Sequence, residues 1–171
     1  MYKICKTEKT VERQKLFQTT LLSMMKKHSY KDITVTSLCK EMSIPRKTFY
    51  RYYDALEDVL AVVIDDVLRD AFLYLEVKPD MDGFFAYWKN QRVLLDVLNK
   101  NEIMYLLIER IYKRMEEERL NNEISYAEIQ QAGQVGALMH MLIVWYEAGM
   151  KQSSEQISML AKNLFRLNDA R

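Results

Sequence analysis

The sequence contains very few residues that break a helix, with four glycines and two prolines among 171 residues. Apolar residues recur every three or four positions along most of the chain, for example over residues 56–75, and no segment keeps the two-residue alternation of a strand. Long helices with short connections satisfy such a pattern. We therefore expect an all-α fold.

Breaks in this periodicity place the expected helices. They cover approximately residues 10–27, 34–42, 46–52, 56–75, 84–99, 102–119, 126–149 and 154–167. Asp54 followed by Glu57 is typical of a capping box at the start of the fourth helix. Pro79, Asp80, Asp82 and Gly83 mark the break in the middle of the chain.

Residues 34–53 predict two short helices joined by a tight turn. Thr34 is a favourable N-cap for the first helix. Pro45 is pre-set for helix entry and biases the residue before it toward an extended backbone, so the chain reverses there and a second helix starts near residue 46. Phe49 and Tyr53 are four residues apart and can pack inward together.

The remaining side chains of the second helix are basic or can donate hydrogen bonds. They are Arg46, Lys47, Thr48, Tyr50, Arg51 and Tyr52. Arginine can fork onto guanine or phosphate, while lysine and hydroxyl groups reach the oxygens of the DNA backbone. A solvated basic helix with a few surface aromatics is the alternative interpretation of the same residues.

The charge distribution along the chain favours the nucleic-acid interpretation. Residues 1–53 hold twelve Lys and Arg against four Asp and Glu, a net charge of +8. Residues 54–171 hold thirteen against twenty, a net charge of −7, so the overall +1 conceals a basic head on an acidic body. Such asymmetry is typical of a nucleic-acid-binding domain attached to a regulatory domain.

Residues 10–60 resemble the N-terminal domain of TetR/AcrR-type transcriptional regulators, through the ordered segments SYKDITVTSLCKEM, SIP, RKTFYRYY and DALEDVL. The resemblance implies a three-helix DNA-binding head with a helix-turn-helix, residues 1–53, followed by a ligand-sensing and dimerisation body, residues 54–171. It also implies a roughly palindromic double-stranded DNA operator. The implied DNA contacts are Thr36, Ser37, Arg46, Lys47, Thr48, Tyr50, Arg51 and Tyr52.

Two positions depart from the pattern of this family. Ser43 stands where the turn usually has glycine, and serine tolerates a left-handed backbone less well. Leu56 stands where a phosphate-binding lysine is usual, which weakens one expected backbone contact.

The helix expected over residues 126–149 is apolar over more than one stripe, so it must be buried on more than one side. Pairing with a second copy satisfies this requirement, with the last helix as a companion surface, and a single central core helix is the alternative. The resemblance also implies a homodimer through the last two helices, and the C-terminal region is similar to a TetR-like subset that includes dihydroxyacetone kinase regulators. The candidate interface residues are Leu138, Leu142, Trp145, Tyr146, Ile157, Leu160 and Leu164.

Aromatic residues of the body suggest an apolar cavity for a small apolar or aromatic effector. The candidate ligand-binding residues are Tyr74, Tyr87, Trp88, Tyr105 and His140. Aromatic residues at helical spacing are also what an ordinary core requires. The acidic body argues against an anionic effector, although a local pocket can differ from the global charge.

The sequence contains no nucleophile elbow, phosphate-binding glycine loop, HExxH motif or Cys/His cluster with metal-ligand spacing, so we expect no enzyme, cofactor or metal site. Cys5 and Cys39 are too few for a disulfide framework, and Cys39 is expected to be a buried thiol. No apolar run reaches the ~20 residues of a membrane span, and the polar N-terminus lacks a signal sequence, which predicts a cytoplasmic location.

The predicted function is a sequence-specific transcriptional regulator, a repressor released by a small-molecule effector. The alternative is a TetR-like regulator or helical interaction protein controlled by a protein partner. An apolar cavity favours the first, and a filled core with an exposed apolar patch away from the dimer interface favours the second.

Overall fold

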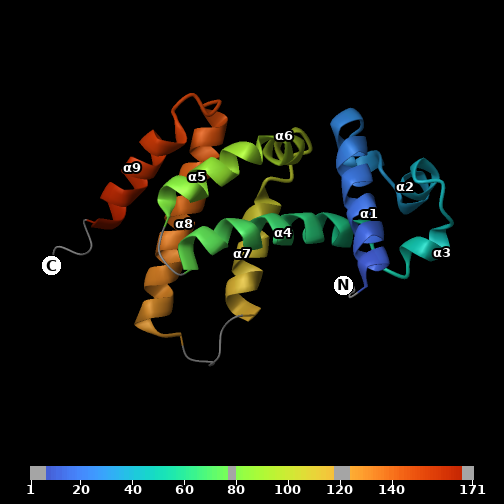
Figure 1. Cartoon of the computed structure of the whole chain (residues 1–171), viewed down its shortest axis with the longest axis horizontal. Coiled ribbons are helices and arrows are strands. Elements are labelled where there is room, and N and C mark those ends of the chain that lie inside the picture. Colours follow the sequence, from blue (N-terminus) through green and yellow to red (C-terminus); the bar gives the residue numbers. More distant parts are fainter. Residues whose placement is uncertain (1–6, 77–79, 118–123, 167–171) are drawn as a thin grey trace. The chain divides into compact units, whose positions relative to one another are not determined.

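A computed structural model of the chain describes residues 7–76, 80–117 and 124–166 (Figure 1). The regular structure in these ranges is helical throughout, which confirms the expected all-α fold. The elements are α1 (Glu8–Lys27), the 3-10 helix η1 (Tyr30–Asp32), α2 (Val35–Glu41), α3 (Arg46–Phe49), α4 (Leu56–Glu76), α5 (Met81–Asn90), α6 (Arg92–Lys100), α7 (Tyr105–Glu117), α8 (Tyr126–Glu147) and α9 (Ser154–Arg166).

The expected break at Pro79 and the expected helix ends at residues 119 and 167 lie outside the described residues. Within those residues, none of the helices combines the length and the apolar character that crossing a membrane requires.

The second helix of the turn motif is shorter than the sequence predicts, because it ends at Phe49 and not at Tyr52. Beyond Phe49 the backbone tightens into three-residue turns, in which the Arg51 amide donates to the Thr48 carbonyl (3.3 Å) and the Tyr52 amide to the Phe49 carbonyl (2.9 Å). Arg51 and Tyr52 therefore follow α3 in a turn.

The single helix expected over residues 84–99 is wrong, because this segment forms α5 and α6. The Asp80 carboxylate accepts a hydrogen bond from the Gly83 amide (3.0 Å), so α5 starts early, at Met81. At Gln91 the amide donates to the carbonyls of both Tyr87 (3.2 Å) and Trp88 (3.0 Å). This shared bond ends α5, and α6 starts at the next residue.

Helix α4 starts at Leu56 as expected, and α7 starts later than expected. Just before α4, Asp58 Oδ2 accepts from Asp54 N and Ala55 N at 3.0 Å each. The Asp54–Glu57 capping box stays a prediction. Glu102 has a left-handed backbone (φ +60°), so α7 starts at Tyr105 and not at Glu102.

The chain packs as two compact units. The first contains the residues up to Val67 together with Asp96–Arg110, and the second contains Leu68–Leu95 and the residues from Ile111 onward. Helices α4, α6 and α7 each contribute residues to both units. This packing division does not coincide with the boundary predicted at residue 53, because residues 54–67 and 96–110 also pack in the first unit. The functional boundary at residue 53 stays a prediction.

Three aromatic rings pack together in the core of the first unit. Phe17 of α1 contacts Phe49 of α3 and Tyr53 edge-on, with 5.6 Å between ring centroids in each pair. Phe49 and Tyr53 lie 5.6 Å apart, as their predicted shared face requires. All three side chains are fully buried. The cluster joins the turn motif to α1.

In the second unit, α5 and α9 lie side by side (Figure 1). Phe84, Phe85 and Trp88 of α5 are fully buried, and Phe85 contacts Trp145 of α8 with 6.0 Å between centroids. Lys162 of α9 binds the Asp82 carboxylate (2.5 Å), and this hydrogen bond lowers the pKa of Asp82. Because both side chains are substantially exposed, the pair contributes little stability beside the apolar contacts.

We predict that Phe17→Ala lowers the free energy of unfolding by about 3–5 kcal/mol, because it leaves a cavity among three buried rings. Urea denaturation followed by circular dichroism measures this change. Leu16→Ala is the matched control, since Leu16 precedes Phe17 on α1 and its side chain is 45% exposed. An equal loss of stability in the two variants would contradict the role of the cluster.

Candidate nucleic-acid interface

The first helix of the turn motif starts at a reciprocal cap. The Thr34 hydroxyl accepts from the Ser37 amide (3.0 Å), and the Ser37 hydroxyl accepts from the Thr34 amide (2.9 Å). The predicted N-cap is therefore confirmed. Ser37 is half-buried in this cap, while Thr36 is exposed at the start of the same helix.

The turn places Ser43 in a left-handed conformation, with φ +53°. The Ser43 amide donates to the Lys40 carbonyl and the Ile44 amide to the Cys39 carbonyl, each at 3.0 Å, which closes the end of α2. In this left-handed conformation, a residue with a side chain is less stable than glycine by about 1–2 kcal/mol. The left-handed backbone expected at this turn position is therefore confirmed.

Pro45 directs the chain into α3. Its φ of −65° and ψ of 143° make it the N-cap, and its carbonyl accepts from the Thr48 amide (2.9 Å). Phe49 then anchors α3 in the aromatic cluster, so the opposite face of this short helix is presented to solvent.

The solvent-facing side chains of this segment are the predicted basic set. Arg46, Lys47, Tyr50 and Arg51 are exposed, and Thr48 and Tyr52 are half-buried. The Tyr52 ring lies 5.7 Å from that of Phe17, so its body packs on the cluster.

Arg46 and Tyr50 form a local pair on this face. Arg46 Nη2 donates to the Tyr50 hydroxyl (3.2 Å), and the guanidinium carbon lies 5.9 Å from the centroid of the Tyr50 ring. This hydrogen bond raises the pKa of Arg46 further above its usual value. The pair presents a permanently charged fork that can bind phosphate or the major-groove edge of guanine.

The thiol behind this face is inert. Cys39 of α2 is 2% exposed, which agrees with the expected buried thiol. Burial raises the pKa of Cys39, so the thiol stays protonated near neutral pH.

Asn101, directly after α6, binds the end of α1 and the start of η1, and the sequence contains no signal of this role. Its Oδ1 accepts from the Tyr30 amide (2.6 Å), while its Nδ2 donates to the carbonyls of Val97 (2.7 Å) and Met25 (3.4 Å). The side chain is 6% exposed. Asn101 therefore ties the end of α1 and the start of η1 to α6.

Neighbouring contacts reinforce this attachment. Lys100 Nζ donates to the Lys26 carbonyl (2.5 Å), and Lys31 lies 3.6 Å from the Glu102 carboxylate. Because α2 follows η1 directly, the position of the turn motif depends on this site. We call Lys100, Asn101 and Glu102 the α6 clamp.

A cavity of about 480 Å³ lies within the second unit. Its lining comprises Phe72, Leu75, Met81, Ile111, Arg114, Met115, Gln131, Gln134, Val135, Leu138 and Phe165. No group of three or more His, Cys, Asp and Glu residues in the described parts of the chain could hold a metal ion.

None of the five predicted ligand-binding residues is among the residues that line this cavity. Tyr74 and Tyr87 stack at 5.9 Å, and Tyr87 contacts the fully buried Trp88 at 6.2 Å, so these three lie together. Tyr105 is 61% exposed and His140 is also exposed.

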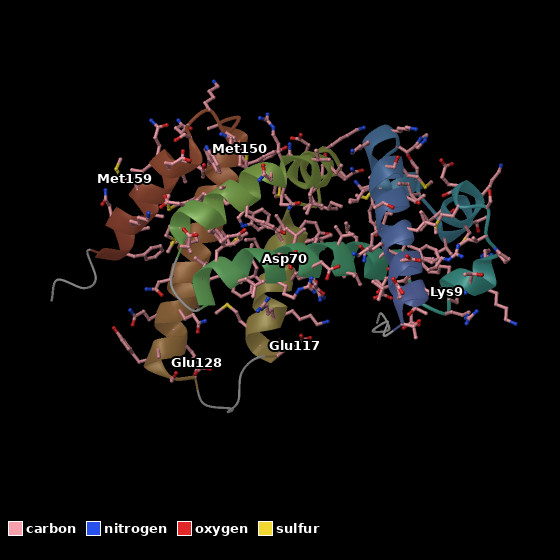
Figure 2. All side chains as sticks on the ribbon, viewed as in Figure 1. Lys9, Asp70, Glu117, Glu128, Met150 and Met159 are labelled. Atoms are coloured by element: carbon pink, nitrogen blue, oxygen red, sulfur yellow. The ribbon has the colours of Figure 1, made fainter. Side chains whose placement is uncertain are left out.

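The predicted dimer residues divide into two groups. Leu138, Leu142, Trp145 and Ile157 are buried within the chain's own fold, and Tyr146 is half-buried. Leu160 and Leu164 are 55% and 45% exposed. Val144 and Met159 are exposed as well, with Met159 on the outer side of α9 (Figure 2).

The fold matches that of a solved structure. The chain is similar to the crystal structure of a TetR transcriptional regulator from Streptococcus agalactiae 2603V, with a TM-score of 0.63 and 16% identity over 92% of this chain and 96% of that one. It is also similar to a structure of the dihydroxyacetone kinase operon activator DhaS, with a TM-score of 0.46 and 21% identity over 91% and 94%. The first similarity shows that the chain has the TetR-like fold.

The chain also has a relative in sequence. The chain is 25% identical over 109 residues to the HTH-type dhaKLM operon transcriptional activator DhaS of Lactococcus lactis subsp. lactis (strain IL1403), which covers 64% of this chain and 55% of that protein. The chain thus spans about half the length of this curated relative. No protein-family model matches the chain.

We predict that Asn101→Ala lowers the free energy of unfolding by about 1–3 kcal/mol, because it leaves the Tyr30 amide without its acceptor. Urea denaturation measures the loss, and hydrogen exchange should show faster exchange of the Tyr30 amide. Asn99→Ala, at an exposed position of the same helix, is the control. If Asn101→Ala were as stable as this control, the contacts of Asn101 in the α6 clamp would not contribute to the free energy of unfolding.

Proposed function

We propose that this chain, which has the TetR-like fold, is a DNA-binding transcriptional regulator that binds a roughly palindromic operator as a homodimer. The observation that carries this proposal is the exposed basic face formed by Arg46, Lys47, Tyr50 and Arg51, on a helix-turn-helix anchored by buried Phe49. Regulators among the similar proteins support the same class of function.

The side chains divide by chemistry into two roles. Arg46 and Arg51 can fork onto the O6 and N7 acceptors of guanine in the major groove. Lys47, Thr48, Tyr50 and Tyr52, with Thr36 at the start of α2, supply donors suited to phosphate oxygens. The hydroxyl of Ser37, the remaining predicted contact, donates to the Thr34 carbonyl within the cap (2.9 Å). Phosphate contacts set the register of the protein on the duplex, and the arginines then read the sequence.

The uneven charge of the chain supports this arrangement. The net charge of +8 over residues 1–53 attracts the phosphate backbone, while the acidic remainder of the chain, at −7, does not. The duplex is therefore drawn to the basic head.

We propose that dimerisation uses the exposed apolar side chains of the last two helices. Val144 of α8 and Met159, Leu160 and Leu164 of α9 are each between 45% and 58% exposed. Covering such side chains in a dimer removes apolar surface from water, and this burial stabilises the dimer by about 25 cal/mol per Å². The buried members of the predicted set, such as Leu142, support this surface from within.

We propose that an effector in the cavity controls DNA binding and releases a repressor. Phe72 and Leu75 of α4 line the cavity, and the same helix begins in the first unit at Leu56. A ligand that shifts α4 would therefore change the separation of the two recognition helices in a dimer. Successive major grooves lie roughly 34–36 Å apart, so binding is sensitive to that separation.

A second candidate is a regulator that activates transcription together with a protein partner. The relative from Lactococcus lactis is named as an activator. In this chain, exposed apolar side chains gather around the start of α8: Ile124 (55% exposed), Tyr126 (83%) and Ile129 (60%). Such a group is suited to binding the surface of another protein.

Selection of bound sequences from a random duplex pool tests the proposed function. The purified protein should enrich a palindromic motif at both low and moderate salt, since base contacts survive the screening of phosphate contacts. A folded, dimeric protein that enriches no sequence would leave the basic face as a nonspecific surface and overturn the proposal.

We predict that Arg46→Ala and Arg51→Ala each weaken binding to the selected duplex by about 1–3 kcal/mol and relax the preference at one base position. Fluorescence anisotropy with single-base variants of the duplex measures both effects. Lys113→Ala, an exposed cation of α7, is the charge-matched control. Equal weakening on all duplexes, with a salt slope lowered by about one, would make both arginines phosphate contacts.

We predict that Leu160→Arg raises the dissociation constant of the homodimer by about a hundredfold or more, because it places an uncompensated charge in the apolar interface. Light scattering after size-exclusion chromatography measures the mass. Val93→Arg is the control, since Val93 of α6 is also exposed, at 54%, outside the proposed interface. A Leu160→Arg protein that keeps the dimer mass would exclude this surface.

A further inference from the structure

Two basic side chains of α1 lie on the same row as a ring of the aromatic cluster. Lys9, Arg13 and Phe17 follow one another at four-residue spacing, so their side chains form one ridge along the helix. Phe17 is fully buried, whereas Lys9 and Arg13 are exposed. The ridge therefore leaves the buried cluster and continues into solvent at the start of α1. We call Lys9 and Arg13 the α1 basic ridge.

This ridge starts close to the exposed basic face of α3. The Phe17 ring lies 5.6 Å from the ring of Phe49 and 5.7 Å from that of Tyr52, which is half-buried. Arg13 is one turn from Phe17, about 6 Å along the helix axis, so the ridge begins beside the segment that follows α3. Figure 2 shows Lys9 at the end of α1 that lies beside α3.

The two cations of the ridge have no partner within the described parts of the chain. Neither side chain takes part in an ion pair or a hydrogen bond with another described residue. Glu8 and Glu12 lie on an adjoining row of α1, rotated by about 100°, and neither pairs with Lys9 or Arg13. The preceding residues 1–6 include two lysines and no Asp or Glu. The ridge therefore presents two positive charges to solvent.

These cations do not stabilise the helix that carries them. Like charges four residues apart on a helix repel each other, as Lys9 and Arg13 do. A positive charge in the first turn of a helix, where Lys9 lies, is unfavourable as well, because that turn carries partial positive charge. Bound anions would remove both effects.

We propose that the α1 basic ridge binds phosphate groups of duplex DNA, next to the bases that α3 contacts. This proposal rests on the DNA binding of the proposed function, and it widens the protein–DNA interface from the turn motif to α1. Lysine and arginine bind phosphate oxygens without reading the sequence. The ridge therefore adds affinity and salt dependence and leaves the base preference to α3.

Fluorescence anisotropy between 50 and 200 mM salt tests the proposal, with the selected duplex and with a duplex of unrelated sequence. Each phosphate contact adds about 0.9 to the steepness of log K against log salt concentration. Lys9→Gln/Arg13→Gln should therefore lower this steepness by about 1.8 on both duplexes. The ratio of unmodified to variant affinity should fall about twelvefold over the same range of salt.

A second pair of exposed cations provides the charge-matched control. Lys15 is two residues from Arg13 and lies on the opposite side of α1, while Lys113 is on α7. Lys15→Gln/Lys113→Gln should keep the salt slope of the unmodified protein. Equal salt slopes in the two double variants would overturn the proposal, as would a base preference altered by Lys9→Gln/Arg13→Gln. Circular dichroism confirms that each variant is folded.

Ethylation interference on the selected duplex locates the contacts. Ethylation of a phosphate that the ridge contacts should weaken binding of the unmodified protein and have no effect on Lys9→Gln/Arg13→Gln. We expect such phosphates beside the bases that α3 contacts. The same interference pattern in both proteins would contradict the assignment to α1.

The two proposals fail in different ways. A protein that selects an operator, with a salt slope that Lys9→Gln/Arg13→Gln leaves unchanged, overturns the ridge inference and leaves the proposed function standing. A protein that binds every duplex alike, with a slope that this variant lowers, overturns sequence-specific regulation and supports the phosphate contacts of the ridge.

Discussion

The exposed basic face of α3 depends on one aromatic cluster. Helix α3 has four residues, far fewer than the about 12–15 that an isolated helix needs in water, so its own hydrogen bonds cannot maintain it. Phe49 and Tyr53 hold the segment against Phe17 of α1, with 5.6 Å between each pair of ring centroids. Each such pair contributes about 0.5–1.5 kcal/mol beyond its buried area. Because the inward face is fixed, the direction of Arg46 and its exposed neighbours is fixed too.

Features that depend on local chemistry were predictable from the sequence. Thr34 caps α2, Pro45 opens α3, and Ser43 adopts the left-handed backbone that its position requires. Each of these follows from interactions within about four residues. The break at Gln91 was not predictable, because periodicity cannot show where one amide is shared between two carbonyls. The early end of α3 was not predictable either, because it depends on the three-residue turns that the Arg51 and Tyr52 amides close.

Contacts between distant segments were the part that the sequence did not reveal. Asn101 binds the Tyr30 amide across 71 positions, and a single asparagine in a helix connection gives no sign of its partner. The predicted ligand residues were aromatic, whereas the cavity is lined by Arg114 and two glutamines among aliphatic and aromatic side chains. Leu142 and Trp145 are apolar because α8 packs within its own chain, which periodicity alone cannot distinguish from a dimer interface. The exposed basic face is thus encoded locally, whereas the contacts that support it form only in the folded chain.

We expect two copies of this basic face to bind one duplex in a fixed spatial relation. Hydroxyl-radical footprinting of the protein on a duplex that it selects tests this arrangement. Two protected stretches are expected, related by the symmetry of the motif and centred about one helical turn (10–10.5 base pairs) apart or at a multiple of that spacing. A single protected stretch, or uniform protection without a pattern, would contradict it.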